Sequence, residues 1–321
     1  MKNSIYPSTT SLQALVVLSL TLFTLSAHGE LSFLPVTAAS GWGAAKVIET
    51  NNSGDAYAPR VGADANGNVM VVWYQSNGTR YDIWANRYTT AGGWGSAYVI
   101  GTDNANSSYS PELAINPAGD AVAVWSEWDG ARYNILSSRY TALTGGWSSD
   151  AVIENGDAAT YSAQVAMDAA GNAIAVWEYW GNFIYANRFT VGAGWGEPGS
   201  LPDTGTRPVR NPQIAINGND ARGRAVVVWK QSDGSRFDIF ANRHENGWGA
   251  TTVIGTGTGY AWAPRVAADP NGNALAVWSQ SDGTRYNILA NRHTEGSGWG
   301  AAFLLESDSG DASSPHVAFD N

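Results

Sequence analysis

The chain has 321 residues, a formal net charge of −10 and no cysteine. This length permits one large core or two ordinary domains, and the lack of cysteine excludes a disulfide framework, so packing must stabilise the fold. No basic block offsets the acidic balance, which argues against nucleic acid or anionic lipid as a partner.

The first predicted element is a signal peptide over residues 1–29. Lys2 precedes an apolar run from Leu12 to Ala27, and small residues follow where a signal peptidase would cut. The run is short for a membrane span, so an uncleaved anchor is the weaker alternative. We expect an exported chain that is periplasmic, surface-displayed or secreted, with no membrane insertion once the signal is removed.

Residues 30–321 are predicted to form one repeat domain. One phrase recurs about every fifty residues, for example as VVWYQSNGTRYDIWANRYTTAGGWG and AVWSQSDGTRYNILANRHTEGSGWG. The repeat aligns tryptophans in two columns, which we interpret as structural rings packed in every unit. The first column holds Trp73, Trp125, Trp177, Trp229 and Trp278, and the second holds Trp94, Trp147, Trp195, Trp248 and Trp299.

Each unit contains four strand-like pieces. In the first full unit these are APRVGAD, VMVVWYQ, TRYDIWANRY and WGSAYVIG, separated by Asn-Gly and Gly-Gly turns. Four strands in about fifty residues is typical of a β-propeller blade, because blades stacked in a ring bury their faces and leave only short edges. The sequence therefore predicts an all-β propeller with five full repeats.

The two ends of the chain supply partial units. LSFLPVTAASGWG and AAKVIET match a third and a fourth strand, and SPHVAFDN matches a first strand. Two interpretations remain, a six-bladed ring whose sequence is cut short at Asn321 and a five-bladed ring with spare end strands. We prefer the six-bladed ring.

The stretch ANRYTTAGGWGSAYVI resembles the Asp-box repeat of bacterial sialidases and related propellers. The resemblance covers residues 31–321 as repeated units and keeps the Gly and the Trp of the motif, while the Asp and the Thr before the Trp are missing. It implies a propeller fold in which this hairpin is structural. It also implies an active site with three arginines, a Tyr nucleophile tuned by a Glu, and an Asp acid/base.

No catalytic residue is assigned from the sequence. The arginines recur in every unit, as in the column Arg87, Arg139, Arg188, Arg243 and Arg292, and residues spread around a ring cannot converge on one reacting atom. Glu178 and Tyr179 are neighbours on a strand and should point to opposite faces. We expect the arginine columns to stabilise the scaffold.

No cofactor or metal site is predicted. The turns DANGN, DPNGN and DAAGN suggest calcium loops, but no bidentate Glu follows them, so calcium is the weaker alternative to a plain hairpin turn. His244 and His293 recur without the partner spacing of a transition-metal site, and we expect them at solvated strand ends.

One column differs between units in a way that a scaffold does not require. It lies two residues before the predicted start of each first strand, ahead of Pro or Ala, and is predicted to ring one mouth of the central channel. Aromatic faces there would stack on sugars, while the alternative is packing between blades. The column holds Tyr57, Tyr109, Tyr161, Arg210, Trp262 and Ser313.

The third unit is shorter than the others. Trp177 and Arg188 are 11 residues apart, whereas the equivalent residues of the other full units are 14 apart. Tyr179, Trp180 and Phe183 occupy the place of the lost turn. They form either a local pocket or a repaired hairpin.

Together these features predict a non-catalytic, exported propeller that binds glycans or an extracellular protein surface through repeated weak sites, as in a lectin or adhesin. The alternatives are a sialidase-like or other glycoside hydrolase and a protein-interaction scaffold.

Overall fold

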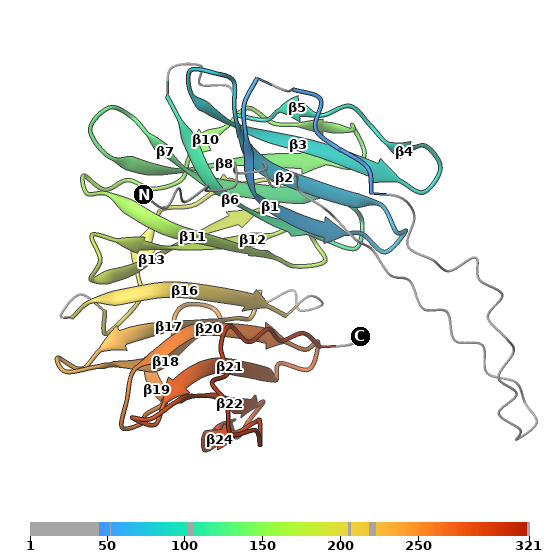
Figure 1. The fold of residues 1–321 in the computed structure, drawn as a ribbon. Coiled ribbons are helices and arrows are strands. Elements are labelled where there is room, and N and C mark those ends of the chain that lie inside the picture. Colours follow the sequence, from blue (N-terminus) through green and yellow to red (C-terminus); the bar gives the residue numbers. More distant parts are fainter. Residues whose placement is uncertain (1–44, 52, 102–105, 205–206, 218–222, 320–321) are drawn as a thin grey trace, which may run out of the picture.

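Every full repeat unit forms one antiparallel sheet in the computed structural model, which describes residues 45–319 apart from 52, 102–105, 205–206 and 218–222 (Figure 1). The predicted signal peptide and the stretch LSFLPVTAASGWG lie outside the described residues. The described part of the chain contains no helix, and therefore none that could cross a membrane.

The strands of each sheet follow the chain from the inside of the propeller to the outside. The first strands are β1 (Ala56–Ala63), β6 (Ser108–Ile115), β11 (Thr160–Met167), β16 (Val209–Ile216) and β20 (Ala261–Ala268). The second strands are β2 (Val69–Ser76), β7 (Ala121–Trp128), β12 (Ala173–Tyr179), β17 (Ala225–Ser232) and β21 (Ala274–Ser281). The third strands are β3 (Tyr81–Thr89), β8 (Tyr133–Thr141), β13 (Phe183–Thr190), β18 (Phe237–His244) and β22 (Tyr286–Thr294).

In four of the blades the outermost strand is divided into two short strands, and both pair with the third strand. These pieces are β4 (Gly93–Trp94) and β5 (Tyr98–Val99), β9 (Gly146–Trp147) and β10 (Ala151–Val152), β14 (Gly194–Trp195) and β15 (Gly199–Ser200), and β23 (Gly298–Trp299) and β24 (Phe303–Leu304). The fourth blade instead has β19 (Thr252–Gly255) and a single bridge between His244 and Trp248.

The hydrophobic core lies between adjacent blades. The five tryptophans of the first column are at most 1% exposed. Four of them pack with side chains of the preceding sheet, and Trp73 packs with Ile48, which precedes the first sheet. Trp177 of β12, for example, shares a cluster with Val122 of β7 and Ile135 of β8. The second strands are apolar along their length because they are covered on both faces.

The second tryptophan column is half-buried and closes the outer edge of each blade. Each ring packs edge-to-face on the third-strand residue opposite, for instance Trp94 on Tyr88 with centroids 5.6 Å apart. His244 and His293 serve as that residue in two blades, against Trp248 and Trp299. The expectation of a solvated strand end is wrong for His293. This side chain is 3% exposed, because Trp299 and Arg243 cover it.

The blades follow one another around a common axis, so the fold is a β-propeller. β1 packs on β6, β6 on β11, β11 on β16 and β16 on β20, which places all the first strands at the centre (Figure 1). Five complete blades are present in the described residues.

Both ends of the described chain extend the blade pattern. The Ile48 carbonyl accepts a hydrogen bond from Asn86 Nδ2, as the Ile153 carbonyl does from Asn187 two blades later. Ser314 donates its backbone N–H to Ser279 Oγ at 3.2 Å and has the positive φ found near the start of the other inner strands. Residues 313–317 therefore lie where the next inner strand would lie.

A β-bulge recurs in every first strand. In β1 the Cα partners change from Tyr57↔Tyr74 to Arg60↔Val72, so one extra residue is inserted. The bulge contains a non-glycine residue with positive φ in each blade, namely Ala58, Ser110, Ser162, Asn211 and Ala263, and Ser314 repeats it at φ 54°. Because pairing continues past the bulge, the predicted ring residues lie within the strands and not ahead of them.

Candidate functional site: one mouth of the propeller channel

The predicted ring residues of the five blades lie at one end of the first strands, where the bulge turns the chain. Each is the cross-strand partner of the residue that directly follows the buried tryptophan of its blade. The pairs are Tyr57↔Tyr74, Tyr109↔Ser126, Tyr161↔Glu178, Arg210↔Lys230 and Trp262↔Ser279. The sixth predicted residue, Ser313, is exposed in the C-terminal segment.

Seven aromatic rings form a continuous chain along the mouth over the first three blades. We call this the tyrosine strip, and it consists of Tyr57, Tyr74, Tyr81, Tyr109, Trp128, Tyr133 and Tyr161. Its successive centroids are 5.4 Å apart for Tyr57–Tyr74, 5.7 Å for Tyr74–Tyr109, 6.2 Å for Tyr109–Tyr133 and 5.9 Å for Tyr133–Tyr161.

The strip combines rigidity with exposure. Tyr57 and Tyr161 at its ends are 41% and 44% exposed, and the tyrosines between them are half-buried. Tyr109, Trp128 and Tyr133 also line a hollow of about 430 Å³ together with Arg80. Aromatic faces held beside polar donors suit a ligand that has both an apolar face and hydroxyl groups.

The mouth changes character between the third and fourth blades, where three charged groups replace the rings. Glu178 on β12 accepts the backbone N–H of Asn211 at 2.7 Å and lies 3.8 Å from Arg210 Nη1. Lys230 on β17 is the cross-strand partner of Arg210. We call Arg210 and Lys230 the cation pair.

Burial perturbs both titratable groups of this cluster. Desolvation raises the pKa of Glu178, although the hydrogen bond from Asn211 and the nearby cations oppose the shift. The pKa of Lys230 is lowered to about 8, mainly by desolvation; Glu178 opposes the shift and the positive charge of Arg210 adds to it. Opposite shifts in one cluster are a mark of functional sites.

The Lys230 ammonium group lies against aromatic faces. Its Nζ is 3.4 Å from the Trp262 ring centroid and 4.9 Å from that of Phe237. Lys230 therefore connects the fourth-blade ring residue Arg210 with the fifth-blade ring residue Trp262. The contacts compensate part of the cost of burying the charge.

The shortened hairpin of the third blade borders the same cluster. Tyr179 and Trp180 line a cavity of about 800 Å³ with Tyr161, Glu178 and Arg210. Phe183, predicted to share this pocket, instead packs against Tyr185 with centroids 6.2 Å apart. Trp180 is 73% exposed and has a positive φ of 50°, an uncommon conformation for a bulky residue.

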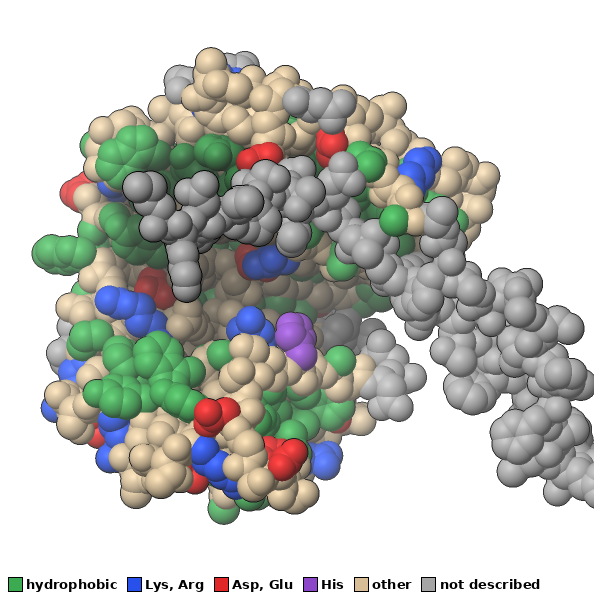
Figure 2. Space-filling view, in the orientation of Figure 1, with side chains coloured by type: hydrophobic (Ala, Val, Ile, Leu, Met, Phe, Trp, Pro, Cys, Tyr) green, Lys and Arg blue, Asp and Glu red, His purple; other side chains and the backbone are tan. Residues whose placement is uncertain are grey.

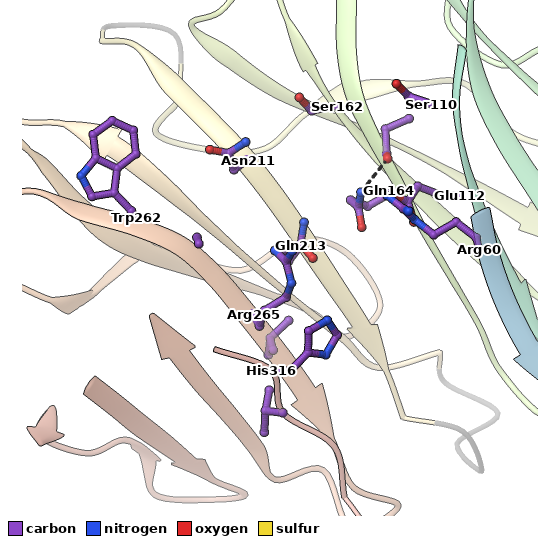
Figure 3. Close-up of a pocket in the computed structure, with 14 residues that line it drawn as sticks. Arg60, Ser110, Glu112, Ser162, Gln164, Asn211, Gln213, Trp262, Arg265 and His316 are labelled. Carbon is purple, nitrogen blue, oxygen red and sulfur yellow. Dashed lines mark hydrogen bonds and ion pairs between the residues drawn. The ribbon is translucent and has the colours of Figure 1, made fainter. Parts of the chain in front are cut away.

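A groove of about 730 Å³ runs along the channel behind the mouth (Figure 3). The residues two positions after the bulge point into it and differ from blade to blade. They are Arg60, Glu112, Gln164, Gln213 and Arg265, followed by His316 of the C-terminal segment. Arg60 and Glu112 form a bidentate ion pair with N–O distances of 2.7 and 2.8 Å.

Sequence reasoning missed three sets of residues around the channel. These are the column after the buried tryptophans, the column after the bulge, and the third-strand rings Tyr81 and Tyr133. The first two columns carried a usable signal, since their residue types vary while the adjacent positions repeat.

Figure 2 shows apolar side chains gathered on both sides of the hollow and charged side chains within it.

The arginine column of Arg87, Arg139, Arg188, Arg243 and Arg292 lies away from this mouth, at the other end of the blades. Arg139 donates to Asp120 at 3.0 Å and stacks over Phe189 in the next blade at 4.9 Å. In the Asp-Asn turns, Asp64 accepts the backbone N–H groups of Asn66 and Asn68. The described residues contain no group of three His, Asp or Glu side chains that could hold a metal ion.

No family model and no curated protein matches this sequence. Among solved structures, the chain is similar to α-L-arabinanase of Penicillium chrysogenum complexed with arabinobiose, with TM-score 0.50, 14% identity and coverage of 83% of this chain and 86% of that one. It is also similar to a K499G mutant of NanB sialidase from Streptococcus pneumoniae, with TM-score 0.51, 8% identity and coverage of 78% and 61%.

A third similar structure is the six-bladed β-propeller fucose-binding lectin of Aleuria aurantia, with TM-score 0.47, 11% identity and coverage of 78% and 79%. At these identities the likenesses describe the fold alone. The chain has a sialidase-like β-propeller fold.

Proposed function

We propose that this propeller is an exported carbohydrate-binding protein that holds a glycan across the channel mouth without cleaving it. The observation that carries the proposal is the tyrosine strip. A packing role would require these rings to be covered, yet Tyr57, Tyr161 and Trp128 are 39–44% exposed. Pyranose rings bind such faces through their apolar C–H surfaces.

The site that supports this proposal is a single extended surface and not a set of equal sites. Tyr57, Tyr109 and Tyr161 come from equivalent positions, but Arg210 and Trp262 continue the column with different chemistry. One chain of several sugars lying over successive rings would use the strip better than one terminal sugar. Nucleic acid, which also stacks on aromatic rings, fits poorly with a net charge of −10.

The test is an array of neutral and charged polysaccharides probed with the mature protein, followed by titration of the best ligand. We expect Tyr109→Ala to weaken binding about tenfold, since one stacked ring contributes about 1–3 kcal/mol. The matched control is Tyr98→Ala, which removes an exposed tyrosine from the outer strand β5. Absence of any retained polysaccharide would reject the proposal and favour a protein surface as the partner.

A glycoside hydrolase is the second candidate, and one observation favours it. Glu178 is a buried carboxyl group with a raised pKa that lines a cavity, as expected of a general acid. Release of sugar from fluorogenic glycosides, abolished in Glu178→Gln, would establish this alternative. Binding retained by Glu178→Gln with no turnover in either protein would support the non-catalytic assignment.

We further infer that the repeat is a degenerate Asp box. The Gly-Trp pairs follow the third strands and their rings pack on the blade edge, as for Trp94 on Tyr88. If the hairpin is only structural, Trp94→Ala should lower the unfolding temperature and leave glycan affinity unchanged. Export is proposed from the predicted signal peptide and is tested by fractionation of cells that express the full chain.

A further inference from the structure

The cation pair places two positive charges side by side on neighbouring strands. Arg210 of β16 and Lys230 of β17 are direct cross-strand partners, and like charges in this position destabilise a sheet. No other blade repeats the arrangement, since the equivalent pairs contain Tyr, Ser, Glu and Trp. A scaffold gains nothing from such a pair.

One carboxylate stands beside the two cations. Glu178 is the anion that interacts with both Arg210 and Lys230, and it is already occupied by the Asn211 amide at 2.7 Å. Asp157 lines the same cavity, but it is exposed, its backbone N–H donates to Tyr179 Oη at 3.2 Å, and its carboxylate repels that of Glu154. The cluster around Lys230 therefore carries one uncompensated positive charge beneath the protein surface.

Arg210 is the member of the cation pair that is open to a ligand from the mouth, and Lys230 lies buried beside it, 4% exposed. The Arg210 side chain is 43% exposed, and its Nη1 is held by the carbonyls of Gly181 and Val209, both at 2.6 Å. These bonds fix the planar guanidinium at the cavity that Trp180 and Tyr161 also line. A fixed guanidinium matches two oxygens of a carboxylate or a sulfate.

We propose that Arg210 binds the acidic substituent of an anionic glycan, with the buried charge of Lys230 beside it strengthening the attraction, and that the neighbouring sugar residues lie on the tyrosine strip and on Trp180. This inference rests on the proposed carbohydrate-binding function and adds the ligand class and its orientation. The shared chemistry is an oxyanion on a sugar, either a uronic acid carboxylate or a sulfate ester. Recognition is local, because the protein as a whole is acidic.

The experiment compares polysaccharides that differ only in charge. Polygalacturonate is compared with its methyl-esterified form, and κ-carrageenan with its desulfated form, by calorimetric titration of the mature protein. We expect at least one charged member to bind about tenfold more tightly than its neutral counterpart, and the pair that shows the difference identifies carboxylate or sulfate. Equal binding of charged and neutral members overturns the inference and leaves the proposed function standing. Binding of none of the four, together with an empty array, removes both.

Two variants and one control locate the preference. Arg210→Gln and Lys230→Met should lower the charged-to-neutral preference to about one while each keeps affinity for the neutral chain. Arg292→Gln is the control, because it removes the same unit of charge from an exposed side chain at the other end of a blade. Preference that persists in both variants, or is lost equally in the control, overturns the assignment of the site.

A pH series provides a readout that a structural role would not change. The pKa of Lys230 lies at about 8, so its positive charge is lost as pH rises through that value. The groups that face it are Glu178, Arg210, Trp262 and Phe237. Arg210 keeps its charge in this range, and because desolvation raises the pKa of Glu178, Lys230→Met is measured in parallel to separate the two titrating groups. The charged-to-neutral preference should therefore fall between about pH 7 and about pH 9 in the natural chain and stay flat in Lys230→Met.

Discussion

Two adjacent columns on the second strands behave in opposite ways. The first column holds tryptophan in every complete blade, buried against the preceding sheet or, for Trp73, against Ile48. The next residue in each blade is Tyr74, Ser126, Glu178, Lys230 or Ser279, and it lies at the channel mouth. Adjacent side chains on a strand point to opposite faces, so one residue can be fixed by packing while its neighbour is free to serve ligand binding. The difference indicates that uniformity marks the scaffold and variation marks the site.

The largest expected effect separates these two columns directly. Trp125→Ala should destabilise the protein by about 3–5 kcal/mol, because it removes a fully buried ring from an interface between blades. Ser126→Ala, one residue later, should cost under about 1 kcal/mol. Urea denaturation followed by circular dichroism measures both. Similar losses in the two variants would show that the mouth column is also part of the packed core.

The second prediction concerns how much the cation pair lowers the free energy of unfolding. Lys230→Met should raise the free energy of unfolding by about 1 kcal/mol at neutral pH, because it removes a buried charge and its repulsion with Arg210.

The sign of the pH dependence follows from the same group. The folded pKa of about 8 lies below the ordinary value of 10.5, so the unfolded chain binds more protons between these values, and the natural chain gains stability as pH rises through that interval. Lys230→Met should lack this gain, and parallel pH profiles of the two proteins would contradict the assignment.

A third, smaller effect is expected at the short hairpin of the third blade. Trp180 has a positive φ that asparagine adopts more readily, so Trp180→Asn should stabilise the fold by about 0.5–1 kcal/mol. The same change should weaken glycan binding by removing an exposed ring. A variant that loses stability instead would indicate that Trp180 packs on the blade and does not serve as a binding platform.

The smallest effect is expected in the ordinary hairpins, where Asp129 and Asp233 accept backbone N–H groups. The pKa of each carboxyl is lowered to about 2, for Asp129 first by the hydrogen bond from Asn134 and then by the backbone N–H groups, and for Asp233 by the backbone N–H groups. The stabilisation is present above the ordinary pKa near 4 and is lost as pH falls toward 2. Blade one makes the same turn with Asn77. The double variant Asp129→Asn/Asp233→Asn should therefore resist acid unfolding slightly better, which thermal scans at about pH 3 would detect.

The blade could be predicted from the sequence because its determinants are local. Asn-Gly and Asp-Gly turns, the buried Val-Trp strand and the period of about fifty residues each act within one unit, and together they favour a four-stranded sheet that must stack on copies of itself. The start of the mouth column was found in the same way, from Tyr57, Tyr109 and Tyr161 standing before the repeated Pro or Ala.

The site itself depends on contacts that no single unit contains. Tyr81 and Tyr133 reach the strip from third strands, and Tyr133 touches Tyr109 and Tyr161 of two different blades. The pairing of Arg210 with Lys230 depends on a bulge that shifts the register by one residue, and a shift of one residue changes the face on which every side chain lies. The sequence by itself determined the repeating unit, since its turns and alternation are short-range. The angle between blades and the bulge decided which side chains meet, because that depends on long-range packing.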